Sequence, residues 1–376
     1  IGLKHKEGSS ISLEPGGQLE LSGAPLKSLH DTCKEAGKHL KLMKKLSEKF
    51  NFVMVGIGHD PKSSKDEIGW MPKERYKIMN QYMPKVGKFG LDMMLRTCTI
   101  QVNLDYSNED DMIKKFQVSL ALQSVATALF ANSPFVDGKI SGFLSKRAFV
   151  WTDTDFDRTG VPMNVFRKDF GYRSWLDYLM SVPMYFIYRD GKYIDVSGQK
   201  FSDFMLGKLI GLEGVFPTLK DWEDHTTVAF PEVRLKQYLE MRGADGGPWS
   251  RICALPAFWV GLLYDDKSIN DSFNLAKNFM NYKILENARI SAAKYGLRGK
   301  IGKFKFIDVA NKMLEISYQG LKRRNYVDKK GVSETQFLDP LFNIIERNET
   351  AAEEMVKNFN LDWNKNINKI FDKDIF

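Results

Sequence analysis

The stretch Thr97-Cys-Thr-Ile-Gln-Val-Asn-Leu-Asp105 alternates apolar and polar side chains without a break over nine residues. Successive side chains of a β-strand point to opposite faces of the sheet. Cys98, Ile100, Val102 and Leu104 are therefore expected to face the core. The opposite face would carry threonine, glutamine, asparagine and aspartate, a set typical of either a solvated strand or a polar ligand site. The sequence predicts a half-buried strand here.

The stretch Glu14-Pro-Gly-Gly-Gln-Leu-Glu-Leu-Ser22 has the same strand periodicity. Leu19 and Leu21 are expected to face the core. The Gly-Gly pair before them allows a tight turn or a close approach of the backbone to a ligand. The polar face would be shared by Gln18, Glu20 and Ser22.

The third such stretch is Tyr238-Leu-Glu-Met-Arg-Gly-Ala-Asp-Gly-Gly-Pro-Trp249. Glu240 and Arg242, two residues apart, would lie on one face of a strand. A carboxylate beside a guanidinium suits a Mg²⁺–nucleotide site, because Mg²⁺ prefers oxygen ligands and arginine binds phosphate oxygens in pairs. A surface ion pair with little energetic effect is the alternative.

The remaining chain mixes helical and extended patterns. Residues 26–50, 73–82 and 110–130 read as helices, 52–58 as a short strand, and 185–194 as a hairpin around Asp190-Gly191. From Asp266 onward glycine becomes rarer and long helical patterns dominate. We predict an α+β or mixed α/β protein, with a single catalytic domain over residues 1–376 and a helical layer at 266–376.

Composition excludes several classes of protein. With 43% hydrophobic and 27% charged residues in 376, the chain can bury a sizeable core and is not disordered. Three cysteines without a CxxC pair argue against a disulfide scaffold and a structural zinc site. The longest apolar run, Ile252–Tyr264, falls short of the roughly 20 residues that span a membrane.

The net charge of +8 suits polyanions such as nucleotide phosphates. Because the charge is spread along the chain, neither nucleic acid nor a membrane is expected as a partner. The sequence contains no GxGxxG, Walker A, GxSxG or HExxH motif. Dinucleotide oxidoreductases, P-loop NTPases, α/β-hydrolases and zinc hydrolases are therefore disfavoured.

A cluster of charged residues occupies Ser145–Gly160. Arginine could bind the carboxylate of a zwitterionic amino acid, and aspartate its ammonium group. A solvated acidic loop is an equally good interpretation at this point. The members of the cluster are Arg147, Trp151, Asp153, Asp155, Asp157 and Arg158.

The stretch Ser12-Leu-Glu-Pro-Gly-Gly-Gln-Leu-Glu-Leu-Ser-Gly-Ala-Pro25 resembles a signature of the glutamate–cysteine ligases shared by plants and many proteobacteria. The resemblance is specific and continues in the same order to about residue 266, after which the chain is less distinctive. The further matching stretches are Met83–Gly87, Gly90–Thr99, Ala128–Phe135, Trp151–Asp155, Asp157–Gly160, Val182–Tyr185, Phe230–Lys236, Glu240–Trp249 and Cys253–Tyr264.

This resemblance implies a glutamine-synthetase-like core, a curved and largely antiparallel sheet flanked by helices. It also implies a reaction that uses ATP and Mg²⁺. ATP would phosphorylate the γ-carboxylate of L-glutamate, and the amine of L-cysteine would displace the phosphate, giving γ-glutamylcysteine. This reaction is the first step of glutathione biosynthesis.

The resemblance also implies roles for individual residues. Glu20 and Glu240 would bind Mg²⁺, with Glu14 and Gln101 completing the ligand set. Arg242 would contact the ATP phosphates, with Arg234 a second candidate. In the substrate sites, Arg147 would bind the glutamate carboxylate beside Trp151, Tyr185 would line the cysteine pocket, and Arg75 would belong to the same region. Arg147 and Arg242 are the expected catalytic residues.

Two departures from the family pattern stand out. Family members carry an earlier strand with a Glu-x-x-Lys-Phe-Gly-Phe type sequence and further acidic ligands, which would precede Ile1. A natural start at Ile1 would leave the Mg²⁺ site incomplete, so we interpret the sequence as a fragment. Plant members also carry redox-active disulfides. Cys33 and Cys253 match one pair, while Val196 and Gly211 replace the other. Two reduced thiols are expected, with a redox switch as the alternative.

Several alternatives remain open. The amine acceptor could differ from cysteine, or the chain could be an inactive regulatory homologue that keeps the fold. We expect a monomer or a homodimer. The Lys-, Ile- and Asn-rich tail and the missing cysteine pair favour a bacterial source and a cytoplasmic location, with a plastid as the alternative for a plant protein.

Overall fold

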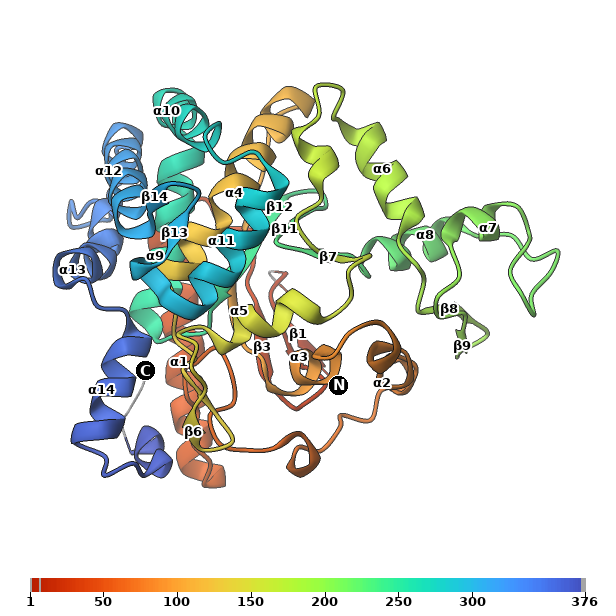
Figure 1. Cartoon of the computed structure of the whole chain (residues 1–376), viewed down its shortest axis with the longest axis horizontal. Coiled ribbons are helices and arrows are strands. Elements are labelled where there is room, and N and C mark those ends of the chain that lie inside the picture. Colours follow the sequence, from red (N-terminus) through yellow and green to blue (C-terminus); the bar gives the residue numbers. More distant parts are fainter. Residues whose placement is uncertain (1, 7, 373–376) are drawn as a thin grey trace.

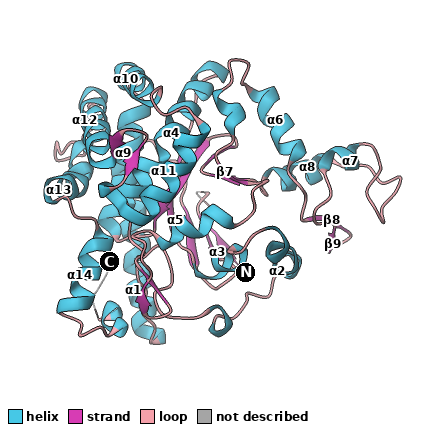
Figure 2. Cartoon of the chain, in the orientation of Figure 1, coloured by secondary structure: helices cyan, strands magenta, loops and turns pink. Residues whose placement is uncertain are grey.

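The computed structural model describes residues 2–6 and 8–372. Helices surround several small sheets (Figures 1 and 2), so the α+β class is confirmed. The sheet that organises the site has three antiparallel strands in the order β11 (Val233–Leu235), β12 (Leu239–Asp245) and β4 (Thr99–Leu104). The additional strand that the resemblance implies would precede Ile1, and Ile1 lies outside the described residues.

The two faces of this sheet differ as the sequence predicts. Val102 and Leu104 of β4, with Leu239 and Met241 of β12, lie in the main hydrophobic core. The other face is polar. Across it, Glu240 lies opposite both Arg234 and Asn103 in the strand register. The alternation in Thr97–Asp105 is therefore confirmed, and it places polar side chains side by side on three strands.

Helices cover the apolar face. α4 (Glu109–Leu129) packs on β12 and β11, and α9 (Trp249–Leu263) packs on β4. Every residue from Val118 to Leu129 is buried, so α4 is surrounded by protein on all sides. α1 (Leu29–Phe50) packs against α9 on its outer side. These helices fix the sheet between a hydrophobic core and the polar face.

The chain from Asp266 onward is largely helical (blue to cyan in Figure 1). α12 packs along α9, and α11 packs against α4 and α5 (Lys146–Val150). No helix of the described residues is both long and apolar enough to cross a membrane. The helices of this part are α10 (Asp266–Ala276), α11 (Tyr282–Tyr295), α12 (Phe306–Arg324), α13 (Asp339–Arg347) and α14 (Ala351–Leu361).

A second three-stranded sheet holds the first of the motif stretches. β1 (Gly2–Lys4), β2 (Ser10–Leu13) and β3 (Leu19–Ser22) pair in order, antiparallel. The turn between β2 and β3 lies against α3 (Gly90–Arg96), since a Cβ on Gly16 would stand 2.3 Å from the Leu95 carbonyl oxygen. Gln18 fixes this approach by donating from Nε2 to the carbonyl of Met94 at 3.1 Å.

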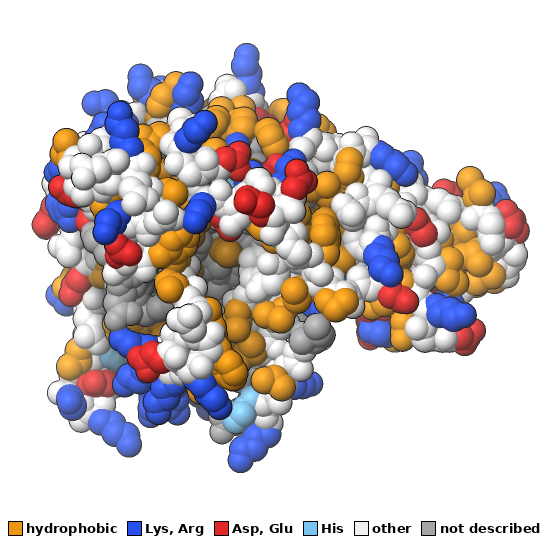
Figure 3. Space-filling model, turned by 90° about the horizontal axis from the view of Figure 1, so that it is seen from below, with side chains coloured by type: hydrophobic (Ala, Val, Ile, Leu, Met, Phe, Trp, Pro, Cys, Tyr) orange, Lys and Arg blue, Asp and Glu red, His pale blue; other side chains and the backbone are white. Residues whose placement is uncertain are grey.

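The remaining elements connect these parts. α6, β8, β9, α7 and α8 form the arm that projects from the body in Figure 1. Figure 3 shows lysine and arginine side chains scattered over the lower face among acidic ones. The elements not yet given are α2 (Glu74–Val86), β5 (Phe135–Val136), β6 (Lys139–Ile140), β7 (Thr159–Gly160), α6 (Tyr172–Ser181), β8 (Phe186–Arg189), β9 (Lys192–Asp195), α7 (Phe201–Met205), α8 (Leu219–Thr226), β10 (Phe230–Pro231), β13 (Lys300–Ile301) and β14 (Phe304–Lys305).

Some local predictions are confirmed and others are wrong. The hairpin around Asp190-Gly191 forms, with both turn residues at positive φ. The strand expected at 52–58 does not form, because this segment bonds to loops instead of to a neighbouring strand: Gly58 donates to the Asn132 carbonyl, and Asn132 donates to the Gly56 carbonyl. Leu19 and Leu21 are only half-buried, because their sheet is thin and peripheral.

The contact between α9 and α12 gives a test of the helical packing. A Cβ on Gly320 would stand 1.9 Å from the Gly261 carbonyl oxygen, so the helices touch through their backbones. We expect Gly320→Ala to lower the free energy of unfolding by about 3 kcal/mol, the upper end for overpacking, in urea denaturation. Gly69→Ala is the control, since nothing lies within 4 Å of a Cβ there. Equal stability of the two variants would contradict the packing.

Candidate active site

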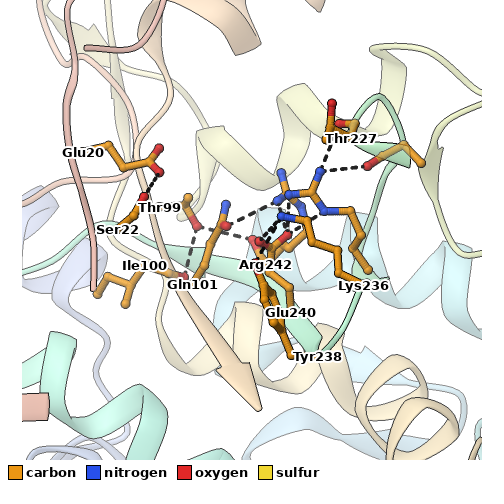
Figure 4. Close-up of polar contacts among 12 residues, drawn as sticks. Glu20, Ser22, Thr99, Ile100, Gln101, Thr227, Lys236, Tyr238, Glu240 and Arg242 are labelled. Atoms are coloured by element: carbon orange, nitrogen blue, oxygen red, sulfur yellow. Dashed lines mark hydrogen bonds and ion pairs between the residues drawn. The ribbon is translucent and has the colours of Figure 1, made fainter. Parts of the chain in front are cut away.

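A cluster of three cations surrounds one carboxylate on the polar face of the sheet (Figure 4). Arg234 donates to Glu240 Oε2 through Nε at 2.8 Å, and its Nη2 lies 2.7 Å from the same oxygen. Arg242 Nη1 donates to that oxygen at 2.6 Å, and Lys236 Nζ lies 3.5 Å from Oε1. Three positive charges therefore share one negative charge, which leaves an excess of positive charge.

Burial and charge act in opposite directions on this cluster. Burial opposes ionisation of Glu240, but Arg242, Arg234 and Lys236 outweigh it and lower the pKa of Glu240 to about 2. Burial and the nearby Arg242 lower the pKa of Arg234 to about 10. Both groups remain charged at neutral pH. An excess of cations with few water contacts suits an anion with several negative charges.

Arg242 connects this cluster to its surroundings. Its Nη1 donates to Gln101 Oε1 at 3.3 Å, across the pair of strands β4 and β12. Its guanidinium lies 5.9 Å from the centre of the Trp151 ring and 5.7 Å from that of Phe230. Arg242 thus stands between the cation cluster on one side and an aromatic wall on the other.

A pocket opens beyond this wall. It is narrow and partly open to solvent. Arg147, Arg242 and Arg289 contribute cations to its lining, and Glu232 contributes a carboxylate. The other lining residues are Thr127, Ala148, Trp151, Phe230, Pro231 and Gly243.

Arg147 is held in this pocket by a short helix. The hydroxyl of Ser145 caps the first turn of α5 by accepting from the Ala148 amide at 3.0 Å. Arg147 is only 4% exposed, and burial lowers its pKa. Its Nη2 donates to the Arg242 carbonyl at 2.5 Å, whereas its Nε has no hydrogen-bond partner among the described residues. A buried guanidinium with a free N–H is prepared to bind an anion.

Two more polar groups beside the pocket are buried without a partner among the described residues. They are the indole Nε1 of Trp151 and the side-chain amide of Gln123, which lies beneath Gly243. A buried polar group without a hydrogen bond costs about 1–3 kcal/mol. Arg147, Trp151 and Gln123 together bring three such groups to one cavity, an arrangement that suits a polar ligand.

The acidic residues of the N-terminal hairpin form a separate group. Burial and the neighbouring Glu20 raise the pKa of Glu14, while Lys73 and Arg75 act in the opposite direction. Glu20 is exposed and accepts from the Ser22 hydroxyl at 3.0 Å. Figure 4 shows Glu20 on its own strand, beside the chain of contacts from Gln101 to Glu240.

The oxygen atoms of Glu14 and Glu20 have the chemistry of Mg²⁺ ligands, and a cation between them would relieve the repulsion that raises the pKa of Glu14. Glu240 is different, because cations already occupy both of its oxygens. Within residues 2–6 and 8–372, no group of three or more His, Cys, Asp or Glu side chains is arranged to hold a metal ion. The predicted set of four ligands is thus divided between two places.

Tyr185 lies in a buried layer next to the pocket and does not line it. The guanidinium of Arg158 lies 3.9 Å from the centre of its ring, and its hydroxyl donates to Met83 Sδ at 3.4 Å. Arg158 is fully buried and pairs with Asp155 at 2.5 Å. Phe230 packs against this layer and also lines the pocket, so it connects the two.

The two cysteines matched by resemblance lie elsewhere. Cys33 of α1 and Cys253 of α9 are buried free thiols where these helices pack. The thiol of Cys253 and burial raise the pKa of Cys33, so the two side chains are neighbours. The pair belongs to the helix interface on the core side of the sheet.

Sequence reasoning missed two residues of the pocket, Glu232 and Arg289. Glu232 had a signal, because it lies two residues before Arg234 in the stretch Phe230–Lys236 that the family resemblance covers. Arg289 also had one, because it lies in helical register with the buried residues Leu285, Ala288 and Ala292. A charged residue on an apolar helix face marks a buried ion pair or a site.

Comparisons with known proteins agree on one family. The family model described as glutamate-cysteine ligase family 2 matches residues 2–372. A chloroplastic glutamate–cysteine ligase of Medicago truncatula is 50% identical over 373 residues, which cover 99% of this chain and 72% of the relative. The corresponding Arabidopsis thaliana protein is 50% identical with 99% and 70% covered, and glutamate–cysteine ligase B of Oryza sativa subsp. japonica is 50% identical with 99% and 73% covered.

These relatives correct one prediction. The sequence favoured a cytoplasmic protein of bacterial source, but the relatives are chloroplastic proteins of plants. The prediction was wrong because it used the Lys-, Ile- and Asn-rich tail and a missing cysteine pair. The amino-acid composition of one segment does not determine the compartment in which a protein works.

The cation cluster predicts a dependence of stability on pH. The folded pKa of Glu240, about 2, is below its ordinary value of 4.5, so the carboxylate stabilises the fold above pH 4.5 and loses this effect as the pH falls toward 2. We expect Glu240→Gln to lower the free energy of unfolding by about 3 kcal/mol at pH 7, because buried cations lose their partner.

Urea denaturation at pH 7 and pH 3 measures this effect. The difference between parent and variant should shrink by about 2 kcal/mol at pH 3, since the unfolded parent binds a proton there and the folded parent does not. Glu48→Gln on the exposed surface of α1 is the control and should behave as the parent does. A difference that is the same at both pH values would contradict the assigned pKa.

Proposed function

The chain belongs to the glutamate–cysteine ligase family 2, and from this premise we propose that it joins L-glutamate to L-cysteine with ATP in the first step of glutathione biosynthesis. The observation that carries the proposal is the position of the pocket. A buried arginine with a free N–H lies beside a cluster of cations, so an amino-acid site adjoins an anion site.

The reaction has two chemical steps. The γ-carboxylate of glutamate attacks the γ-phosphorus of ATP, giving γ-glutamyl phosphate and ADP. The amine of cysteine then attacks the acyl carbon, the C–O bond to phosphate breaks, and the amine loses a proton. Charge shifts onto phosphate oxygens in both steps, so fixed cations that meet these oxygens lower the barrier.

The cation cluster is the proposed site for the phosphates. Arg242 faces both the cluster and the pocket, so its guanidinium can contact the oxygens that are transferred. Arg234 is more deeply buried and donates to backbone carbonyls of Thr227 and Ala229 as well as to Glu240. We assign Arg242 the direct contact and Arg234 the task of holding Glu240 in place.

The pocket is the proposed site for glutamate. Arg147 offers its free Nε–H to a carboxylate, and the indole N–H of Trp151 can donate to the same ligand. Both groups are buried, so water competes weakly for them. The aromatic wall of Trp151 and Phe230 excludes water from the reacting acyl group.

The acidic hairpin is the proposed site for Mg²⁺. Glu14 and Glu20 would supply the oxygen ligands, and Arg75 lies close to Glu14. Bound there, Mg²⁺ would neutralise charge on the ATP phosphates. Gln101 and Glu240 can join this ligand set only if Arg242 leaves Glu240, because the guanidinium now occupies the space beside that carboxylate.

Three proposals rest on the resemblance more than on contacts. Tyr185 serves the cysteine site from the layer behind Phe230. The sheet of β4, β11 and β12 belongs to a glutamine-synthetase-like core within one catalytic domain, with the helices after Asp266 as its outer layer. Cys33 and Cys253 are the pair that a disulfide would join.

Turnover tests the proposed function directly. We expect ADP release in a coupled assay with ATP, Mg²⁺ and glutamate to rise strongly when cysteine is added. The assay should be run on this chain and on a version extended upstream. Other amines at equal concentration are the control for the acceptor. Faster turnover with another amine would identify that amine, and not cysteine, as the acceptor. No amine-dependent turnover in either form would indicate a non-catalytic member of the family.

Arg147 tests the glutamate site. We expect Arg147→Ala to raise the KM for glutamate at least tenfold, since a charge-assisted hydrogen bond is lost. The KM for ATP should change less than about threefold, because Arg147 is not part of the cation cluster. Initial rates over both substrates measure the two constants. Equal increases in the KM for glutamate and the KM for ATP would contradict the role assigned to Arg147.

A further inference from the structure

Among the residues that the structure describes, Glu232 is the one carboxylate in the lining of the pocket. It lies between β10 and β11, and its side chain is 16% exposed. The backbone holds it on both sides, because its amide donates to the Gly160 carbonyl at 2.9 Å and its carbonyl accepts from the Arg242 amide at 3.2 Å. Its position relative to Arg242 is therefore fixed by the sheet.

Only one of its two carboxylate oxygens is used. Arg289 Nε donates to Oε1 at 2.8 Å, while Oε2 accepts no hydrogen bond from the part of the chain that the structure describes. A carboxylate has acceptor sites on both oxygens. The free oxygen is therefore available to a donor that enters the pocket.

Several hydrogen bonds hold the Arg289 guanidinium in place beside Glu232. Its Nη1 donates to both oxygens of Glu286 at 3.0 and 2.9 Å, and its Nη2 donates to the Trp151 carbonyl at 3.0 Å. Gly160 leaves room for it, since a Cβ there would stand 3.2 Å from Nη1. Arg289 therefore connects α11 to two lining residues of the pocket.

Two lining residues of the cavity have unused polar groups of opposite charge. Arg147 has a free N–H, and Glu232 has a free oxygen. Arg242 is paired with Glu240, and Arg289 is paired with Glu232 and Glu286. An amino-acid ligand carries a carboxylate and an ammonium group, and these match the two free groups.

We propose that Glu232 binds the α-ammonium group of the amino-acid substrate, and that Arg289 of α11 is the positioning residue that holds Glu232 for this purpose. The proposal rests on the proposed function for the identity of the amino acid, glutamate. It makes Glu232 a specificity residue, because dicarboxylates without an ammonium group leave its second oxygen without a donor.

Binding of glutamate and of glutarate tests this proposal. Glutarate has the same two carboxylates and lacks the ammonium group. Isothermal titration of the parent should give a Kd for glutarate at least roughly tenfold weaker than for glutamate, as expected for loss of a charged hydrogen bond. Glu232→Gln should weaken glutamate binding by at least about tenfold and change glutarate binding by less than about twofold.

Glu286→Gln is the matched control. The glutamine oxygen can still accept from Arg289 Nη1, so the anchor of Arg289 is kept while one charge outside the pocket lining is removed. Glutamate binding should therefore stay within about twofold of the parent. Arg289→Met should weaken glutamate binding and leave glutarate binding unchanged, and Arg289→Lys should restore part of the loss. Thermal unfolding of each variant identifies those that are folded.

The outcomes separate this proposal from the proposed function. Equal weakening of glutamate and glutarate by Glu232→Gln, or no weakening of either, would overturn the role of Glu232. The same loss of glutamate binding in Glu286→Gln would show that Glu232 acts only by holding Arg289 in place, which would also overturn its role in binding the ammonium group. Selective loss without cysteine-dependent turnover would support Glu232 and reject the ligase reaction. A parent that binds no glutamate would overturn the role of Glu232.

Discussion

The buried carboxylate of Asp245, at the end of β12, joins the segments from which the pocket is built. It accepts from the Ser133 and Ser145 hydroxyls at 2.7 and 2.8 Å and from the Asn132 amide at 2.8 Å. These donors belong to the loops on both sides of the β5–β6 hairpin. Ser145 also caps α5, so the position of Arg147 depends on this one acceptor. Burial raises the pKa of Asp245, and the donors together with nearby Arg147 oppose that effect.

This arrangement explains how a small sheet supports two binding regions. The polar face of β12 presents Glu240 and Arg242 to the proposed anion site, and the carbonyl of Arg242 accepts from Arg147 in the proposed amino-acid site. One strand thus holds the two regions in register. A phosphoryl group and its acceptor carboxylate must meet at a short distance, and shared backbone is a rigid way to set that distance.

The sequence could predict the parts of this site that depend on local periodicity. The alternation in Thr97–Asp105 and the spacing of Glu240 and Arg242 place these side chains on one face, because strand geometry alone decides it. The prediction of a strand at 52–58 was wrong, because strand formation also depends on a neighbouring strand. The local sequence does not show whether such a neighbour exists. Glu232 and Arg289 meet across 57 residues, and only the packing of α11 brings them together.

The packing of α11 connects the last third of the chain to the proposed substrate pocket. α11 packs on α4 and α5, so its buried face cannot turn without disturbing the helix that carries Arg147. Burying Arg289 in that face costs desolvation, which Glu232, Glu286 and the Trp151 carbonyl offset. A leucine at this position would be a simpler way to fill the interface. The charged network is retained, we infer, because it fixes a carboxylate at the wall of the pocket, where a hydrophobic contact could not.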